Sequence, residues 1–381
     1  MKYYIIAGEA SGDLHGANLM KGLLQHDPSC SIRFWGGGKM AAVGGTLVKD
    51  YRDNAVMGLV EVLGRLGSIL RNLTFCKEDI LQFSPDAVIL IDYPGFNLKI
   101  ARFAHSHGIK VFYYIPPKVW ARGESRIRLL RKYVDKVFII FPFEVEYFRS
   151  KGLDVIYNGN PLVDNINDTP SIHMGREEWL RSHSLSEDGR PVIAFLAGSR
   201  KMEVDYLMPR IIRTAAVLTE KTGGRFRYML AAAPSIDLEY YRRYTEDSDI
   251  EIIQGDTYGV LSHSEAAVIS SGTASLEAAV IGTPQVVCYG MNPITYALAR
   301  LIVRLDTISL ANMILGKHIF KELLQGDCTP GNIADEVLRM TDDADYRRRM
   351  IQDYDDMRAM LGERDSAART AADIERLIQE K

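Results

Sequence analysis

The sequence has few cysteines and no cysteine or histidine metal motif. Its four cysteines, Cys30, Cys76, Cys288 and Cys328, lie far apart and form no CxxC pair among the 381 residues. The eight histidines are scattered, and HExxH is absent. A disulfide framework or a structural zinc site would need such closely spaced ligands. The pattern therefore indicates a protein of a reducing compartment without a zinc site. No other metal and no cofactor are expected.

Long apolar runs and an excess of one charge are also missing. No segment approaches the roughly 18 uncharged apolar residues of a transmembrane helix. The apolar run after Lys2 is broken by Glu9 and is too short for a signal peptide. The formal net charge is only −3, with 25% charged residues, so nucleic acid is not indicated as a partner. We therefore expect a soluble cytoplasmic protein, or one that contacts a membrane only at its surface.

The chain does contain a regular alternation of short apolar runs and amphipathic stretches. Several runs lack polar alternation, which is typical of parallel strands buried on both faces. Helical patterns such as 16–26 and 96–108 lie between them and end near glycine or proline. The sequence therefore predicts an α/β fold of Rossmann-like parallel sheets. The predicted strands are 2–8, 31–36, 86–92, 110–115, 136–141, 154–158, 191–198, 225–233, 250–255, 266–272 and 284–289.

Two prolines and no strong hydrophobic period mark residues 160–175 as a linker between two similar halves. We expect an N-terminal domain at 1–165 and a second domain at 166–341, facing each other across a cleft. The tail at 342–381 is rich in helix formers and adds no strand. Its helices are therefore expected to pack back on the N-terminal domain. Ligands of such sheets bind beyond the carboxyl ends of the strands.

The first predicted strand ends in GEASGD, where a dinucleotide-binding strand would carry GxGxxG. Gly8 and Gly12 permit a tight turn. Glu9 and Asp13, however, place negative charge where a pyrophosphate would sit. Carboxylates suit the hydroxyl groups of a sugar, because they accept hydrogen bonds from them. The alternative is that Asp13 only caps the following helix.

A second acidic position follows the predicted strand at 86–92, in the stretch IDYPGFN. Asp92 leaves a buried strand at its carboxyl end, and Pro94 and Gly95 then start a helix. A general base belongs at such a position. The alternative is an acid that caps the helix or ties down a loop.

In the second half, the strand at 191–198 runs into the stretch LAGSR and a helix. Gly198 and Ser199 offer backbone and hydroxyl donors, and Arg200 can stabilise a phosphate oxyanion. This loop has the right charge for a diphosphate.

The stretch SSGTASLEAA at 270–279 is a second candidate phosphate cradle in the same half. Its helix begins with the small residues Ser271 to Ala274. Glu277, one turn further on, can accept hydrogen bonds from ribose hydroxyls. Together the two loops predict that this half binds a nucleoside diphosphate.

Two further segments, 56–73 and 118–136, combine apolar or aromatic residues with arginine and lysine. The first is either a core helix or an exposed surface for acyl chains and anionic head groups. The second can hold a phosphate or lie against an anionic membrane, or be an ordinary solvated helix face.

In their order, these motifs resemble those of bacterial lipid-A-disaccharide synthases. The resemblance runs from the first strand to about Gln325 and adds the stretches FPFE, GNPLVD, SLANMILG and KELLQ. It implies an inverting glycosyltransferase of GT-B fold in lipid A biosynthesis. Such an enzyme joins UDP-2,3-diacylglucosamine to 2,3-diacylglucosamine 1-phosphate (lipid X), releasing UDP and a β-1′,6-linked disaccharide phosphate.

The resemblance also implies roles for individual residues. Asp92 would deprotonate the acceptor 6-hydroxyl, while Glu9, Ser11 and Asp13 would position the sugars. Arg200 and the helix start at Ser271–Ala274 would stabilise the leaving diphosphate, so that no metal is required. The implied UDP-sugar contacts are Gly198, Ser199, Arg200, Glu203, Ser271, Gly272, Thr273, Ala274, Glu277, Asn312, Glu322 and Gln325.

The expected partners are the two acylated substrates and the anionic inner face of the inner membrane. The sequence leaves the oligomeric state open, although a homodimer can form when C-terminal helices exchange between protomers. Two positions depart from the family pattern: Arg122 replaces a frequent aromatic residue, and Gly95 replaces a frequent acid. The base is therefore assigned to Asp92.

Two alternatives remain open at this point. One is another GT-B enzyme on UDP-sugars, such as a UDP-N-acetylglucosamine 2-epimerase or a glycosyltransferase of peptidoglycan assembly. The other is a non-catalytic module that binds lipid or nucleotide. An epimerase would convert UDP-N-acetylglucosamine without an acceptor, whereas the module would bind UDP or lipid without turnover.

Overall fold

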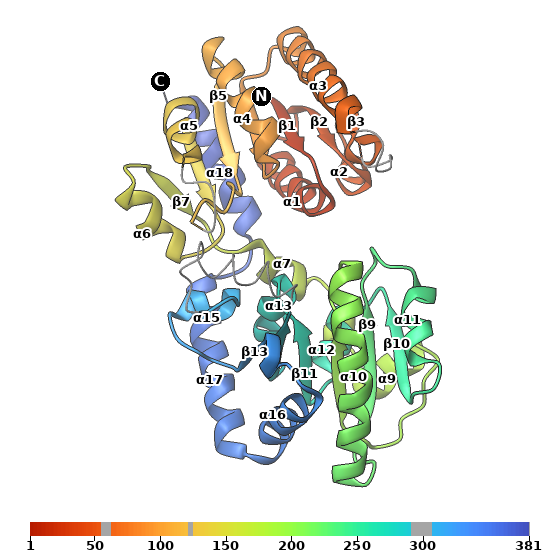
Figure 1. The fold of residues 1–381 in the computed structure, drawn as a ribbon. Coiled ribbons are helices and arrows are strands. Elements are labelled where there is room, and N and C mark those ends of the chain that lie inside the picture. The colour runs from red at the N-terminus through yellow and green to blue at the C-terminus, as the bar shows by residue number, and fades with distance from the viewer. Residues whose placement is uncertain (55–61, 121–124, 291–306, 381) are drawn as a thin grey trace. The chain divides into compact units, whose positions relative to one another are not determined.

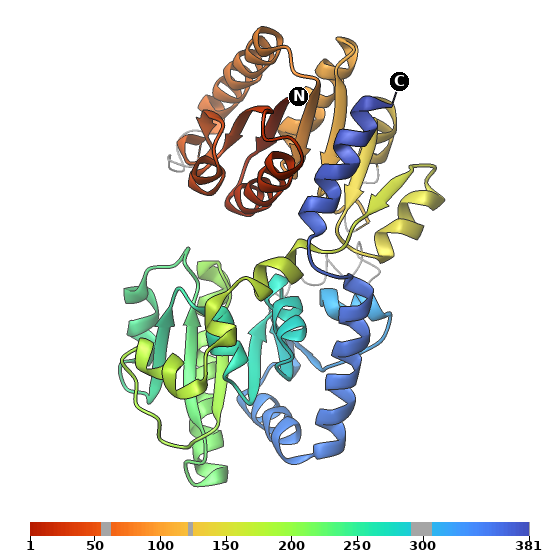
Figure 2. The same ribbon diagram turned by 180° about the vertical axis from the view of Figure 1, so that it is seen from behind.

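The computed structural model describes residues 1–54, 62–120, 125–290 and 307–380 (Figures 1 and 2). The chain divides into two units: Met1–Pro161 with Gly362–Lys381, and Leu162–Leu361. Each unit contains one parallel sheet, which confirms the predicted α/β class.

The sheet of the first unit has seven strands in the order β3-β2-β1-β4-β5-β6-β7. All strands are parallel, but the order in which they are added reverses between β1 and β4, which are adjacent although β2 and β3 lie between them in sequence. The strands are β1 (Lys2–Ala7), β2 (Ser31–Gly36), β3 (Thr46–Asp50), β4 (Ala87–Ile91), β5 (Lys110–Tyr114), β6 (Lys136–Ile139) and β7 (Val155–Tyr157). The helices are α1 (Ala10–His26), α2 (Gly38–Val43), η1 (Tyr51–Asn54), α3 (Val62–Phe83), α4 (Pro94–Ser106), α5 (Arg126–Tyr133), α6 (Phe143–Ser150) and α18 (Ser366–Gln379).

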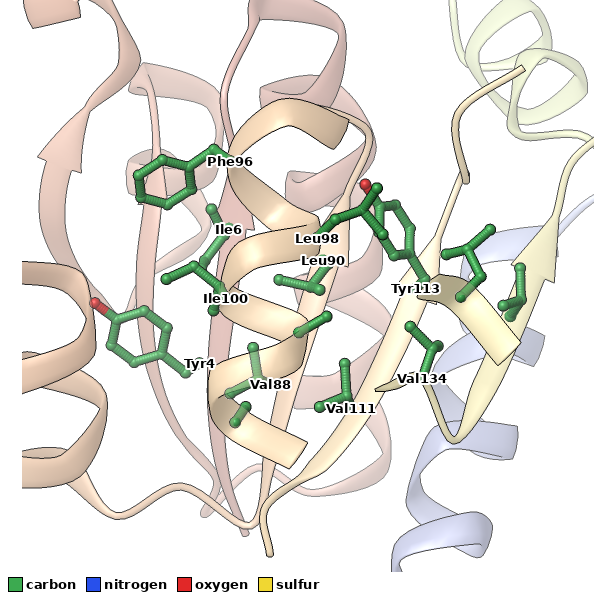
Figure 3. Close-up of a cluster of buried hydrophobic side chains, with 14 of the residues drawn as sticks. Tyr4, Ile6, Val88, Leu90, Phe96, Leu98, Ile100, Val111, Tyr113 and Val134 are labelled. Atoms are coloured by element: carbon green, nitrogen blue, oxygen red, sulfur yellow. The ribbon is translucent and has the colours of Figure 1, made fainter. Parts of the chain in front are cut away.

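The central strands of this sheet are buried on both faces. Tyr4 and Ile6 of β1 belong to one core cluster, and Tyr3 and Ile5 to another on the opposite face. Alternate residues of a strand point to opposite faces, so both sets must be apolar. In Figure 3, side chains of α4 lie against those of β4 and β5 within the first cluster. This packing fixes the carboxyl end of β4, where Asp92 emerges.

The second unit repeats the architecture with six strands in the order β10-β9-β8-β11-β12-β13. The order in which its parallel strands are added reverses between β8 and β11. The strands are β8 (Val192–Leu196), β9 (Arg227–Ala232), β10 (Ile250–Gln254), β11 (Ala266–Ser270), β12 (Gln285–Tyr289) and β13 (Glu322–Leu324). The helices are α7 (Pro161–Asn167), α8 (Pro170–His173), α9 (Arg176–Ser182), α10 (Lys201–Thr222), α11 (Leu238–Thr245), α12 (Thr257–Ser262), α13 (Thr273–Ile281), α15 (Leu310–Leu315), η2 (Gln325–Asp327), α16 (Pro330–Asp342) and α17 (Ala344–Leu361).

The boundaries between the units differ from the expected ones. The expected linker at 160–175 contains two short helices, α7 and α8, each starting at a proline. Of the tail, α17 stays in the second unit, because its buried face packs on α16, α15 and α13. Only α18 returns to the first unit, where it packs along α1. The second unit therefore extends to Leu361 instead of residue 341.

Candidate functional site

The four main motifs lie in pairs at the two points where strand order reverses. GEASGD follows β1 and IDYPGFN follows β4, and these strands are neighbours in the first sheet. LAGSR follows β8 and SSGTASLEAA follows β11, neighbours in the second sheet. In open α/β sheets, the crevice beyond the strand ends at such a reversal is where ligands bind. Each unit therefore has one candidate ligand site of its own.

Asp92 lies in a strained stretch of backbone at the first site. The φ angles of Asp92 and Tyr93 are 44° and 47°, and that of Ile115, at the end of β5, is 61°. Positive φ is unfavourable for L-residues and most of all for a β-branched one such as isoleucine. Backbone strain of this kind persists only where surrounding contacts hold it, and it is concentrated at functional sites.

Three hydrogen bonds hold the backbone of Asp92 in this conformation. Its carbonyl oxygen accepts from the Tyr113 hydroxyl at 2.6 Å and from Asn97 Nδ2 at 2.8 Å. Its own N–H donates to the carbonyl of Ile115 at 3.2 Å. Tyr113 and Asn97 are buried residues that the sequence analysis did not single out. Each carries a polar group within an otherwise apolar stretch, and this was the sequence signal that could have identified them.

The carboxyl group of Asp92 is half-buried, and this makes it more basic. Burial raises its pKa, while the positive charge of Lys118 and the N–H of Tyr93 lower it, leaving the pKa above its usual value. A carboxylate with a raised pKa is a stronger base and accepts a proton more readily. The group is therefore suited to general base catalysis.

The GEASGD loop closely approaches Tyr93, the residue after Asp92, at one point. A Cβ atom on Gly8 would lie 2.3 Å from the Tyr93 ring, so only glycine fits there. Glu9 and Ser11 are exposed at the start of α1, and the charge of Glu9 contributes to a raised pKa of the Tyr93 phenol. Both side chains are therefore accessible from solvent at the end of β1.

Asp13, in contrast, is turned into the protein. Its carboxylate is buried and accepts hydrogen bonds from three backbone N–H groups, those of Gly37 at 2.7 Å, Lys39 at 3.0 Å and Met40 at 3.1 Å. It thereby holds the turn between β2 and α2. Asp13 therefore stabilises the start of α2 and does not cap its own helix, α1.

At the second site, Glu203 organises the LAGSR loop. Its carboxylate accepts from the N–H groups of Ser199 at 3.0 Å and Arg200 at 3.3 Å, and from Arg200 Nη1 at 3.3 Å. The N–H of Ser199, which was expected to face a phosphate, thus already has an acceptor. The Arg200 side chain is 81% exposed, so the guanidinium is available to an anion.

The neighbouring helix α13 begins with an open N-terminus. Gly272 precedes it, and Gly272 and Thr273 are both exposed. Unbonded N–H groups and the helix dipole make such a terminus a site for anions. Glu277, one turn into α13, has a pKa raised by burial and accepts from the Tyr258 hydroxyl at 3.4 Å. Tyr258 is a further residue that the sequence analysis missed.

Asn312 and Glu322 are engaged inside the protein. Glu322 accepts hydrogen bonds from the N–H groups of Ile308 and Ser309, each at 3.0 Å, from the Thr307 hydroxyl, and from Asn312 Nδ2 at 2.9 Å. Asn312 is fully buried and also accepts from the N–H of Ile319 at 2.8 Å. These two side chains shape the SLANMILG segment. Gln325 follows β13 and begins η2.

Some predicted features lie outside the described residues. Arg122 and the first part of the 56–73 segment are outside the described ranges. Within those ranges no three His, Cys, Asp or Glu side chains converge so as to hold a metal ion. Of the helices described in the structure, none has the length and hydropathy needed to cross a bilayer.

Comparisons with known proteins agree over nearly the whole chain. A family model described as lipid-A-disaccharide synthetase matches residues 3–375. The lipid-A-disaccharide synthase of Syntrophus aciditrophicus (strain SB) is 40% identical over 372 residues, covering 96% of this chain and 95% of the relative. That of Coxiella burnetii (strain CbuG_Q212) is 34% identical over 374 residues, covering 98% of both chains.

Solved structures with the same fold act on UDP-sugars or transfer sugars. The UDP-GlcNAc 2-epimerase of Neisseria meningitidis bound to UDP-GlcNAc superposes with a TM-score of 0.69, at 14% identity and full coverage of both chains. The calicheamicin glycosyltransferase CalG4 superposes with a TM-score of 0.60, at 13% identity, covering 99% of this chain and 98% of that chain. At such low identity these neighbours establish the GT-B fold alone. The family match and the close relatives go further, and from them the chain belongs to the lipid-A-disaccharide synthase family.

Proposed function

We propose that the protein transfers a 2,3-diacylglucosaminyl group from UDP to the 6-hydroxyl of lipid X, with inversion at the anomeric carbon. The products are UDP and the β-1′,6-linked disaccharide 1-phosphate. Family membership supports the reaction. One observation supports Asp92 as the general base. Its carboxylate has a raised pKa, and its backbone is held in a strained conformation where the strand order reverses.

In the proposed step, Asp92 accepts the proton of the acceptor 6-hydroxyl. The hydroxyl oxygen forms a bond to the anomeric carbon from the face opposite to the diphosphate. The bond from that carbon to the diphosphate oxygen breaks, and its electron pair leaves with UDP. Glu9 and Ser11 would orient the sugars through hydrogen bonds to their hydroxyl groups, and Asp13 would act indirectly by holding the β2–α2 turn.

The second unit is the proposed UDP-sugar site. The exposed guanidinium of Arg200 and the N-terminus of α13 at Ser271–Ala274 would bind the diphosphate, with Gly198 and Ser199 completing the loop. Glu277 would accept from the ribose hydroxyls. Glu203, Asn312 and Glu322 would keep the surrounding loops in place, and Gln325 would contact the donor. An arginine and a helix dipole can stabilise the leaving charge, so the reaction is expected to be metal-independent.

UDP release tests the proposal directly. Wild-type protein with both acylated substrates is expected to release UDP in buffer containing EDTA. Asp92→Ala is expected to lower kcat by about 10²- to 10⁴-fold while UDP still binds, because only the proton acceptor is removed. Asp92→Asn serves as the isosteric variant, and UDP-N-acetylglucosamine without acceptor as the control for epimerase activity. Full activity of Asp92→Ala would place the base elsewhere, and release of UDP only with EDTA omitted would overturn metal independence.

We also propose that the first unit docks on an anionic membrane surface at the cytoplasmic face of the inner membrane. In α3, Leu70 is 60% exposed and Phe75 is 47% exposed. In α5, Arg128, Arg131 and Lys132 are exposed. Apolar contact and attraction to anionic head groups would act together. Pelleting with anionic vesicles at low salt and release at high salt would support this, whereas no pelleting at any salt would remove it.

A homodimer is the remaining part of the proposal. Helix α18 follows a short connection after α17 and docks on α1 through a buried face. In the proposed dimer, α18 of each copy docks on α1 of the other copy. Light scattering of the purified protein would detect the dimer as a doubled mass.

A further inference from the structure

The turn that carries Gln325 has an unfavourable backbone conformation. The φ angle of Gln325 is 50°, in the left-handed region. This region is ordinarily occupied by glycine, asparagine or aspartate and is unfavourable for glutamine. An external restraint must therefore hold the turn.

Two side chains of α10 supply such a restraint. The Tyr206 hydroxyl donates to the Gln325 carbonyl oxygen at 3.1 Å. Arg210 Nε donates to the carbonyl oxygen of Cys328, directly after η2, at 2.9 Å. The turn is thus bonded to α10 at both of its ends.

The two side chains also stiffen each other. Arg210 Nη1 donates to the Tyr206 carbonyl at 2.5 Å, and the guanidinium carbon lies 3.8 Å from the centre of the Tyr206 ring. This geometry combines a hydrogen bond with a cation–π contact. Burial raises the pKa of Tyr206 to about 12, so the phenol remains a donor throughout the physiological pH range.

The same face of α10 also holds the phosphate loop. Glu203, Tyr206 and Arg210 are three and four residues apart and therefore lie on one side of the helix. Glu203 binds the N–H groups of Ser199 and Arg200, one turn before Tyr206. One helix, α10, thus connects the LAGSR loop to the Gln325 turn.

We propose that Tyr206 and Arg210 are positioning residues of the nucleotide-sugar site, which hold the Gln325 turn in register with the Arg200 loop. The inference rests on the proposed binding of UDP-sugar by the second unit. Their proposed role is indirect, through the Gln325 turn, and involves no contact with the donor. Their effect is to keep the turn in the bound conformation before the ligand arrives, which reduces what binding must reorganise.

The test compares two matched tyrosine variants by calorimetric titration with UDP. Tyr206→Phe removes one O–H group and keeps the ring under Arg210. It is expected to weaken UDP binding by about 3- to 10-fold, the effect of one hydrogen bond. Tyr240→Phe makes the same chemical change on α11, where the hydroxyl donates to Asp205 at 2.6 Å, and is expected to leave UDP affinity unchanged.

Steady-state kinetics and a second background separate positioning from general stability. Tyr206→Phe should raise KM for the UDP-sugar while kcat at saturating donor stays within about twofold. In a Gln325→Gly background, glycine adopts positive φ without a restraint, so Tyr206→Phe should no longer weaken UDP binding. The conservative Arg210→Lys variant should lose the stacked, directed contact and resemble Tyr206→Phe.

The outcomes distinguish this inference from the proposed function. An equal loss of UDP affinity in the wild-type and Gln325→Gly backgrounds would overturn the inference, because Tyr206 would then act by another route. So would a lower melting temperature of Tyr206→Phe with unchanged UDP affinity. If Arg200→Ala weakens UDP binding and Tyr206→Phe does not, the inference alone fails. If wild-type protein binds no UDP, the proposed function fails as well.

Discussion

At the scale of single residues, the charge that matters most to the proposed base is Lys118. Its positive charge lowers the pKa of Asp92, against the larger effect of burial. The Lys118 ammonium lies 5.7 Å from the centre of the Phe141 ring. Two residues on, Trp120 Nε1 donates to the buried carboxylate of Glu144 at 2.9 Å, which anchors this segment to the start of α6. The lysine is therefore held by its surroundings.

Replacing Lys118 should move the pH dependence of the reaction. In Lys118→Gln the pKa of Asp92 is expected to rise, because burial then acts without the opposing cation. A base must be deprotonated to act, so the acidic limb of kcat/KM should shift to higher pH while the plateau above it is kept. Lys99→Gln, on the exposed face of α4, makes the same change in net charge and should leave the limb in place. A limb that stays fixed in Lys118→Gln, or moves equally in both variants, would contradict the prediction.

The direction in which an acid points was the feature that the sequence could not give. The position of Asp92 at the end of a buried strand was predictable from the apolar run before it. Asp13 and Glu322 have equally suggestive neighbours, yet their oxygens bind backbone N–H groups of segments distant in sequence. Such bonds depend on which loops the fold brings together. Local pattern contains no information on them.

At the scale of elements, the contact between α1 and α18 is what returns the end of the chain to the first unit. Ala371 and Ile374 of α18 belong to the same core cluster as Leu19 and Leu23 of α1. Lys110 Nζ donates to carbonyl groups at the end of α18, including that of Glu380 at 2.9 Å. A cation at a helix C-terminus is favourable both as a cap and for the helix dipole.

This contact depends on a glycine. A Cβ atom on Gly22 of α1 would lie 3.0 Å from both Ala368 Cα and Ala371 Cβ. Gly22→Val should therefore force the two helices apart and lower the free energy of unfolding by about 1–3 kcal/mol, as overpacking does. Urea denaturation measures the loss, and limited proteolysis should cleave the tail near Gly362 more readily.

Gly38→Val is the matched control, because nothing lies within 4 Å of a Cβ atom at the exposed Gly38. It should leave tail proteolysis unchanged. If Gly22→Val resists denaturation and proteolysis as well as the wild type does, then α18 does not depend on close approach to α1.

The long buried strands and the helices between them were predictable, whereas the short edge elements were not. Each predicted apolar run contains a strand of the structure. The edge strands β3 and β13 were missed, because they are short and polar residues interrupt them. The linker prediction at 160–175 missed α7 and α8, because proline was taken as a breaker although it is well accommodated in the first turn of a helix.

At the scale of the whole molecule, the two strand-order reversals belong to separate hydrophobic cores. The clusters around β1 and β4 lie in the first unit, and that around β8 and β11 lies in the second. The carboxylates proposed to contact the acceptor, those of Asp92 and Glu9, are at the first reversal, and Arg200 with the open N-terminus of α13 is at the second. Charge thus divides the two halves of the proposed reaction, the deprotonation of a hydroxyl and the departure of a diphosphate.

Hydrogen exchange with UDP alone should make this division visible. The nucleotide is expected to slow exchange of the N–H groups at 272–275, since the first N–H groups of a helix have no acceptor within the helix. A smaller change is expected at Ser199 and Arg200, whose N–H groups are already bonded to Glu203. The segments after β1 and β4 should exchange as in the free protein.

Arg200→Ala, which keeps both helix starts, should reduce the protection at 272–275 at a fixed UDP concentration by weakening binding. Protection by UDP of the segments after β1 and β4, with none at 272–275, would place the nucleotide in the first unit and reverse the assignment of the two halves.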